Sequence, residues 1–110
     1  MTLSVELIRE LCKKRRIKWS HHAVARYQER DISRNEILQC IEHGEVIEEY
    51  PADYPTPSCL ILHIVISKAL HVVVGHDDKF IYIITAYRPD PEKWTNGFRE
   101  RKVQDNVFLL

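Results

Sequence analysis

The spacing of apolar residues changes at Gly44, and this change limits the folds that the chain can adopt. Before Gly44, apolar residues recur at helical spacing, as at positions 7, 8, 11 and 12. After it, they gather in short runs rich in β-branched and aromatic residues, which favour strands. Helices followed by consecutive strands are typical of the α+β class. We therefore expect two to three N-terminal helices packed on one face of an antiparallel sheet of about four strands.

A serine lies at the start of each predicted helix and can cap its N-terminus. The helical segments are residues 3–16, 20–30 and 33–43, with Ser4, Ser20 and Ser33 as the caps. In the third segment Glu36 follows Ser33 at the spacing of a capping box, and Gly44 is the expected stop.

The strand predictions fall on four runs, which are residues 45–50, 59–66, 70–74 and 80–87. The segment "PADYPTPS" holds three prolines and is expected to be a loop. The segment "GHDDK" is expected to be a tight hairpin, and no role is predicted for His76 within it. "IKW" at 17–19 is interpreted as a short extended link, and "PDPEKW" as a turn. The tail, residues 98–110, could add an edge strand, pack back or bind a partner.

Composition excludes several classes of protein. The 110 residues suit one domain, and no apolar run approaches the roughly 20 residues of a membrane helix, so we expect no membrane partner. The three cysteines, Cys12, Cys40 and Cys59, form no CxxC pair and are interpreted as reduced core residues of a cytoplasmic protein without a signal peptide. Six histidines without metal-ligand spacing and only three glycines predict neither a metal site nor a nucleotide cofactor.

Positive charge is concentrated near the N-terminus although the net charge is zero. Residues 9–34 hold nine lysines and arginines against three acids, a balance of +6 that the rest of the chain offsets. Such a basic region is a candidate surface for a polyanion, or simply a solvated helix face.

The most specific feature inside this region is the spacing of His22, Arg26 and Arg30. Four-residue steps place all three along one stripe of a helix, at the border of its buried face. His22 falls in the first turn, where free backbone N–H groups attract anions and favour a neutral imidazole. A neutral base beside two arginines suits metal-independent RNA cleavage, in which the base activates the ribose 2′-OH and the arginines stabilise the phosphorane. The alternative is structural: Arg26 and Arg30 would pair with acids such as Glu42, Glu45 or Glu48, and His22 would be partly buried.

The run 80–87 supplies further candidates at its polar end. Simple alternation places Thr85 and Tyr87 on one face together with Ile81 and Ile83, beside a packed helix. Tyr87 could stack on a base or donate a proton, and His71 in the neighbouring strand could reach the same cleft. Tyr87 and Arg88 could equally be ordinary strand-end residues.

Several segments in fixed order resemble a small bacterial family, domain of unknown function 4258. They are "IKWSHHAVARYQERDIS", "EVIEEYPADYPTPSCLIL", "LHVVV" and "IYIITAYRPDPEKW", within residues 17–94. The family pattern is Ser-x-His-Ala-x-x-Arg-x-x-x-Arg on a helix, a Pro/Tyr/Ser loop, and strands ending in Ile-Thr-x-Tyr-x-Pro. The Ser-x-His-Ala frame selects His22 rather than His21.

The resemblance implies a RelE/barnase-like fold of the barnase/EndoU/colicin/RelE ribonuclease group and a toxin role in a toxin–antitoxin pair. It implies RNA as the substrate, with ribosome-bound mRNA as one candidate, and a cognate antitoxin, for which a YgiT-type zinc-finger protein is the candidate. Its site residues would be His22, Arg26, Arg30, Thr85, Tyr87 and His71. Two alternatives stay open: an RNA-binding module that cuts nothing, and a protein-interaction domain that docks through "NVFLL", residues 106–110.

Overall fold

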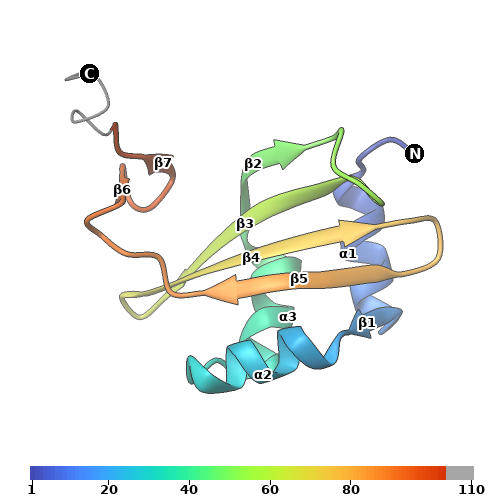
Figure 1. The fold of residues 1–110 in the computed structure, drawn as a ribbon, viewed down its shortest axis with the longest axis horizontal. Helices are drawn as coiled ribbons and strands as arrows, with labels where there is room; N and C mark the ends of the chain where they lie inside the picture. The colour runs from blue at the N-terminus through green and yellow to red at the C-terminus, as the bar shows by residue number, and fades with distance from the viewer. Residues whose placement is uncertain (104–110) are drawn as a thin grey trace.

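A computed structural model describes residues 1–103 as three helices and seven strands. The helices are α1 (Val5–Lys13), α2 (His21–Glu29) and α3 (Arg34–His43). The strands are β1 (Ile17–Trp19), β2 (Glu45–Tyr50), β3 (Ser58–Val65), β4 (Lys68–His76), β5 (Ile81–Tyr87), β6 (Trp94–Thr95) and β7 (Glu100–Arg101). Figure 1 shows the helices gathered on one side of the large sheet, which confirms the α+β class.

All three predicted helix caps are confirmed. The side chains of Ser4, Ser20 and Ser33 each accept a hydrogen bond from a backbone N–H three residues later. Ser33 and Glu36 form the complete capping box, and α3 ends at Gly44. These signals are local, which is why the sequence predicts the helix starts to the residue.

The large sheet is mixed rather than antiparallel. Its strand order is β1-β5-β4-β3-β2, and β1 pairs with β5 in parallel, Ile17 opposite Ile81 and Trp19 opposite Ile83. The expectations of about four strands and of a mere link at 17–19 were therefore wrong. The main-chain carbonyl of Arg16 accepts from the N–H of Ile81 at 2.9 Å, so the link joins the sheet edge.

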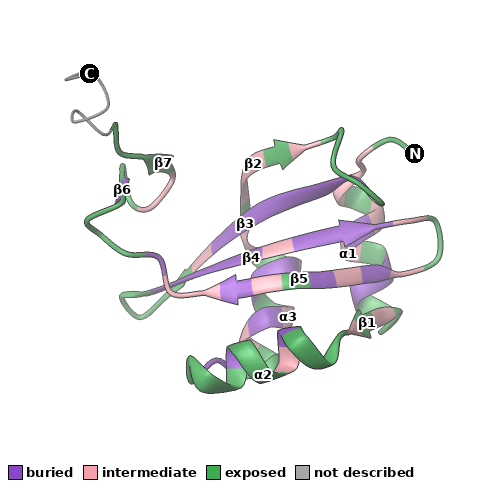
Figure 2. Cartoon of the chain, viewed as in Figure 1, coloured by how far each residue is buried: buried purple, intermediate pink, exposed green. Residues whose placement is uncertain are grey.

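The core lies between the helices and one face of this sheet. Its fully buried members include Ile8, Ile37 and Ile41 from the helices and Val72 and Val74 from β4. Figure 2 shows the central strands β3 and β4 buried and α2 mostly exposed. The three cysteines are free and buried, as predicted.

His76, for which no role was predicted, has a structural role in the fold. It is fully buried, and its Nε2 accepts from the backbone N–H of Ser4 at 2.9 Å, so Nδ1 carries the proton and donates to the carbonyl of Asp77. This bond joins the start of α1 to the end of β4.

A bulge in β5 changes which side chains share a face. The pairing shifts between Val73, opposite Thr85, and Val74, opposite Ile83. Ala86 therefore joins Ile83 in the core, whereas Thr85 and Tyr87 point to the opposite face. We call this second face, which the helices do not cover, the outer face. The predicted grouping of Thr85 and Tyr87 with the core residues, beside a packed helix, was wrong because simple alternation ignores the extra residue.

The segment after β5 forms a small two-stranded ribbon in which Trp94 pairs with Arg101 and Thr95 with Glu100. Figure 1 shows this ribbon at the end of the sheet where β5 finishes. The predicted docking segment, residues 106–110, lies outside the described residues. Within residues 1–103 none of the helices has the length and apolar character needed to span a bilayer.

Candidate functional site

The predicted stripe lies at the surface of α2. His22, Arg26 and Arg30 are all exposed, and Ala23 and Tyr27 form the buried side of the helix. His22 follows the cap by two residues, in the first turn as predicted. A helical rise of about 1.5 Å per residue separates His22 from Arg30 by about 12 Å along the axis. The stripe therefore suits an extended ligand rather than a single phosphate.

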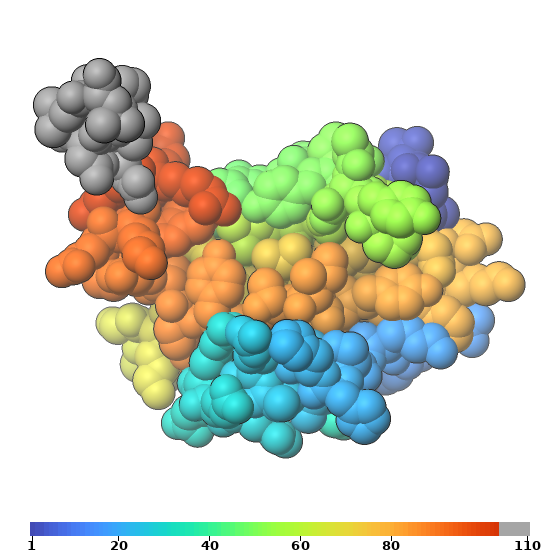
Figure 3. Space-filling view, viewed as in Figure 1, coloured from blue at the N-terminus to red at the C-terminus, as the bar shows by residue number. Residues whose placement is uncertain are grey.

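Five cations surround β1 and α2, and we call them the basic edge: Arg16, Lys18, Arg26, Arg30 and Arg34. Within residues 1–103 none of the five forms an ion pair with a carboxylate. Figure 3 shows α2, in blue to cyan, at the surface alongside the orange band of β5. Cations without a carboxylate partner keep their full charge available to an anion.

The acids that could have neutralised the stripe are engaged elsewhere. Glu42 pairs with Arg15 at 3.0 Å, Glu45 with Arg99 at 3.0 Å and Glu48 with Arg101 at 2.9 Å. His22 is exposed rather than partly buried. Among the described residues, the acids named in the structural alternative do not pair with Arg26 or Arg30, and His22 is not buried. The structural alternative is therefore not observed.

Aromatic rings lie among these cations. The Arg16 guanidinium and the Lys18 ammonium lie 5.3 Å and 4.4 Å from the Phe80 ring centroid. Arg34 lies 5.2 Å from the centroid of Trp19. Cations interleaved with aromatic rings are the combination that binds single-stranded nucleic acid, since backbone and bases find separate partners.

Arg30 connects the stripe to the end of β5. Its Nη1 donates to the main-chain carbonyl of Ala86 at 2.8 Å and lies 3.4 Å from the hydroxyl oxygen of Thr85. This half of β5 is open at its edge because β1 pairs only with residues 81–83. Arg30 and Thr85 therefore lie close together, with the arginine reaching the strand from the side.

His71 and Tyr87 form a second pair at the same end of β5. They are opposite one another in the β4–β5 register, and Nδ1 of His71 lies 3.2 Å from the Tyr87 hydroxyl oxygen. His71 therefore lies beside Tyr87 on the outer face and not in a cleft between α2 and the sheet, and its role as a second acid or base group stays a prediction. Tyr87 is two residues from Thr85 on the outer face, so the two pairs are neighbours.

The hydrogen bonds of His71 determine its tautomer. Its Nε2 lies 3.0 Å from the carbonyl oxygen of Phe98, which can only accept. A neutral His71 therefore carries its proton on Nε2, and Nδ1 accepts the hydrogen bond that Tyr87 donates. Burial lowers the pKa of His71, and Arg101 lowers it further, outweighing the Phe98 carbonyl and Glu48. Burial likewise raises the pKa of Tyr87, so both groups are neutral near pH 7.

Charged residues near this pair were missed by the sequence analysis. The hydrogen bond from Arg101 holds the pKa of Glu48 below its usual range, and Glu48 acts on both His71 and Tyr87 through its charge. The available signal was the spacing of Arg99 and Arg101, because residues two apart share one face of a strand.

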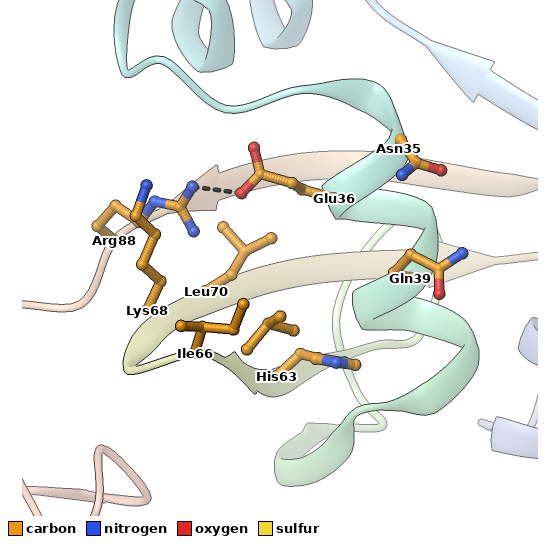
Figure 4. A pocket seen from close by; sticks show the side chains of 9 residues that line it. Asn35, Glu36, Gln39, His63, Ile66, Lys68, Leu70 and Arg88 are labelled. Atoms are coloured by element: carbon orange, nitrogen blue, oxygen red, sulfur yellow. Dashed lines mark hydrogen bonds and ion pairs between the residues drawn. The ribbon is translucent and has the colours of Figure 1, made fainter.

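A pocket on the helix side of the sheet lies apart from the predicted site residues. The pocket has a volume of ≈ 380 Å³ and lies between α3 and the β3–β4 hairpin. Figure 4 shows Leu70, His63 and the ion pair of Glu36 with Arg88 in its lining. Its rim includes Ile66, which is 92% exposed in the hairpin turn. None of the predicted site residues lines this pocket. No group of three or more potential metal ligands is found within residues 1–103.

A family model covers most of the surfaces just described. It matches residues 19–88 and carries the description domain of unknown function, DUF4258. The chain belongs to the DUF4258 family. The match includes α2 with its stripe and β4 and β5 with His71, Thr85 and Tyr87. No curated protein and no solved structure matches the chain.

The DUF4258 match ends before the β6–β7 ribbon. Phe98, which fixes the tautomer of His71, is therefore outside the matched residues. The same holds for α1 at the other end of the chain.

Proposed function

We propose that the chain is a metal-independent endoribonuclease that cuts single-stranded RNA by attack of the 2′-OH. The observation that carries this proposal is the junction at the end of β5, where Arg30 meets Thr85 beside the His71–Tyr87 pair. The cations of the basic edge, which form no ion pair with a carboxylate among residues 1–103, lead to that junction along α2.

In this proposal the RNA backbone lies along the basic edge. Arg26 and Arg30 contact phosphates, since guanidinium groups can donate two parallel hydrogen bonds to phosphate oxygens. Trp19 and Phe80 provide rings on which bases can stack. The bound phosphate nearest Arg30 is the scissile one.

The reaction requires a group that removes the 2′-OH proton and one that protonates the leaving 5′ oxygen. The 2′ oxygen forms a bond to phosphorus, the bond from phosphorus to the 5′ oxygen breaks, and a 2′,3′-cyclic phosphate results. Tyr87 is the base that the geometry supports best: its oxygen takes the 2′-OH proton while its own proton passes to the neutral Nδ1 of His71. The protonated pair then returns one proton to the leaving 5′ oxygen. Arg30 stabilises the added charge of the phosphorane. The assignment of His22 as the general base or acid remains a prediction.

A second candidate function is RNA binding without cleavage. It is favoured by the state of His71, which is fully buried with both ring nitrogens in hydrogen bonds. Only Tyr87, which is partly exposed, offers a reactive atom from this pair to a ligand.

The wider setting is proposed from the family resemblance. It comprises a RelE/barnase-like fold, action as a cytoplasmic toxin on free or ribosome-bound mRNA, and neutralisation by an antitoxin such as a YgiT-type zinc-finger protein. The placement of the helices on one face, which leaves the outer face to the candidate site, supports such a fold.

The test is cleavage of a mixed-sequence, end-labelled RNA by the purified full chain in EDTA. We expect products with 2′,3′-cyclic phosphate ends from the wild type, and a loss of about 10²-fold or more with Tyr87→Phe. Tyr82→Phe is the matched control, because it removes a hydroxyl from the same strand where it is bonded to Asp77. His22→Ala, folded and inactive, would support the role predicted for His22. Salt-sensitive binding without cleavage by any protein would favour the second candidate function.

A further inference from the structure

The β6–β7 ribbon lies directly on His71. The indole of Trp94 packs edge-on against the imidazole, with ring centroids 4.5 Å apart and an interplanar angle of 86°. The carbonyl oxygen of Phe98 accepts a hydrogen bond from Nε2 of His71, with 3.0 Å between nitrogen and oxygen. Two of the groups that surround His71 therefore come from this ribbon and its turn.

Two ion pairs fasten the ribbon to β2, and the second of them is bidentate. Nε of Arg99 lies 3.0 and 3.1 Å from the carboxylate oxygens of Glu45. The Arg101 guanidinium contacts both oxygens of Glu48 at 2.9 and 3.0 Å. Paired geometry of this kind fixes orientation as well as distance.

The sheet register relates these anchors to His71. Glu45 is opposite Leu62, and Leu62 is opposite His71, so anchor and histidine share one cross-strand row. Two strand spacings of about 4.8 Å separate them. The ribbon thus spans from β2 to β4. Its ion pairs hold it to β2, and its contacts with His71 hold it to β4.

The turn of the ribbon holds one residue, Phe98, in an unfavourable backbone conformation. Asn96, Gly97 and Phe98 have φ values of 52°, 64° and 68°. A bulky side chain such as phenylalanine rarely adopts positive φ. Such conformations persist where surrounding contacts impose them, and they concentrate at functional sites.

We propose that residues 94–101 are a positioning element of the candidate site, in which the Phe98 carbonyl holds His71 in the Nε2–H tautomer. This inference rests on the proposed function. It identifies the segment that holds His71 in the tautomer which that function requires. In the other tautomer, Nδ1 would carry the proton and could not accept one from Tyr87. A histidine held in the wrong tautomer loses most of its catalytic value.

The opposite role is a cover that blocks the site, and the two roles predict opposite results. Releasing a cover raises activity, whereas loosening a positioning element lowers it. The combined variant Arg99→Gln with Arg101→Gln loosens the ribbon and keeps side chains of similar polarity. Lys93→Gln with Lys102→Gln is the matched control, because it removes the same charge from the same segment at exposed side chains.

The direct readout is the ¹⁵N NMR spectrum of the imidazole nitrogens in the labelled full chain. We expect wild-type His71, and His71 in the control, to show the pure Nε2–H tautomer. The double variant should show mixed tautomers, with kcat lowered about tenfold or more and KM nearly unchanged. Arg101→Gln alone should change the tautomer mixture and kcat in the same direction. It replaces the double variant if that protein does not fold.

Three results would overturn the positioning role. They are an Nδ1–H tautomer in the wild type, an unchanged tautomer in a folded double variant, and a rise in activity when the ribbon is loosened. If no protein cuts RNA but His71 shows the expected tautomers, the ribonuclease proposal fails while the positioning of His71 by the ribbon stands.

Discussion

The basic edge predicts a specific salt dependence of RNA binding. Its five cations, none of which has a carboxylate partner in the described part of the chain, can contact up to five phosphates. Each contact to single-stranded RNA contributes about −0.7 to the slope of log K against log salt. The full slope is then about −3.5, so affinity should fall about 100-fold between about 50 and 200 mM salt. Arg26→Gln should reduce the slope to about −2.8 and weaken binding about fivefold near 0.1 M salt.

The assay is fluorescence anisotropy with a labelled, uncleavable 2′-O-methyl oligonucleotide at several salt concentrations. Lys14→Gln is the matched control: it removes the same charge, but Lys14 is paired with Glu10 at 2.9 Å on α1. The control should leave the slope within about 0.2 of the wild type. Equal losses from Arg26→Gln and Lys14→Gln would refute the reasoning, since binding would then follow net charge and not the basic edge.

Three further predictions concern stability, each measured by urea unfolding. The pKa of His71 is lower in the folded protein than its ordinary value of 6.5, so the unfolded chain binds more protons as pH falls. Stability from this group is complete above about pH 6.5 and should decline toward pH 5, by at most about 1.4 kcal/mol per pH unit, with a flatter profile in His71→Gln. Ser33→Ala removes the cap of α3 and should cost about 1 kcal/mol, whereas a loss under about 0.3 kcal/mol would mean that the capping box contributes little. Gly75→Ala should cost about 1–3 kcal/mol, because the added Cβ would lie 2.6 Å from the hydroxyl oxygen of Thr56; a neutral result would show that the Thr56 loop yields freely.

The parts of the fold that the sequence predicts correctly depend on local interactions. Helix caps and the stop at Gly44 involve residues at most four positions apart, and all were confirmed. The parallel pairing of β1 with β5 joins residues far apart in the chain. Three residues of "IKW" carry no pattern that could specify such a partner, so the mixed sheet could not be predicted.

In the candidate site, too, local features could be predicted from the sequence and long-range features could not. The i, i+4 stripe on α2 follows from helix geometry, and its exposure agrees with that reasoning. The face of Thr85 and Tyr87 could not be predicted, because the bulge depends on how β4 and β5 pair. The contact of His71 with Phe98 arises from a ribbon whose anchors lie on β2, and its sequence, "FRERK", is interpreted as a charged tail when taken alone.

The central claim is that RNA follows α2 to the end of β5, and amide NMR on the ¹⁵N-labelled full chain tests it most directly. The probe is a 2′-O-methyl oligonucleotide, titrated at low salt. The account predicts that chemical shifts change for residues 16–34, for Phe80 and for residues 84–87, while those of α1 and of the pocket beside Ile66 stay in place. Shifts confined to that pocket or to α1, with none along α2, would contradict the claim.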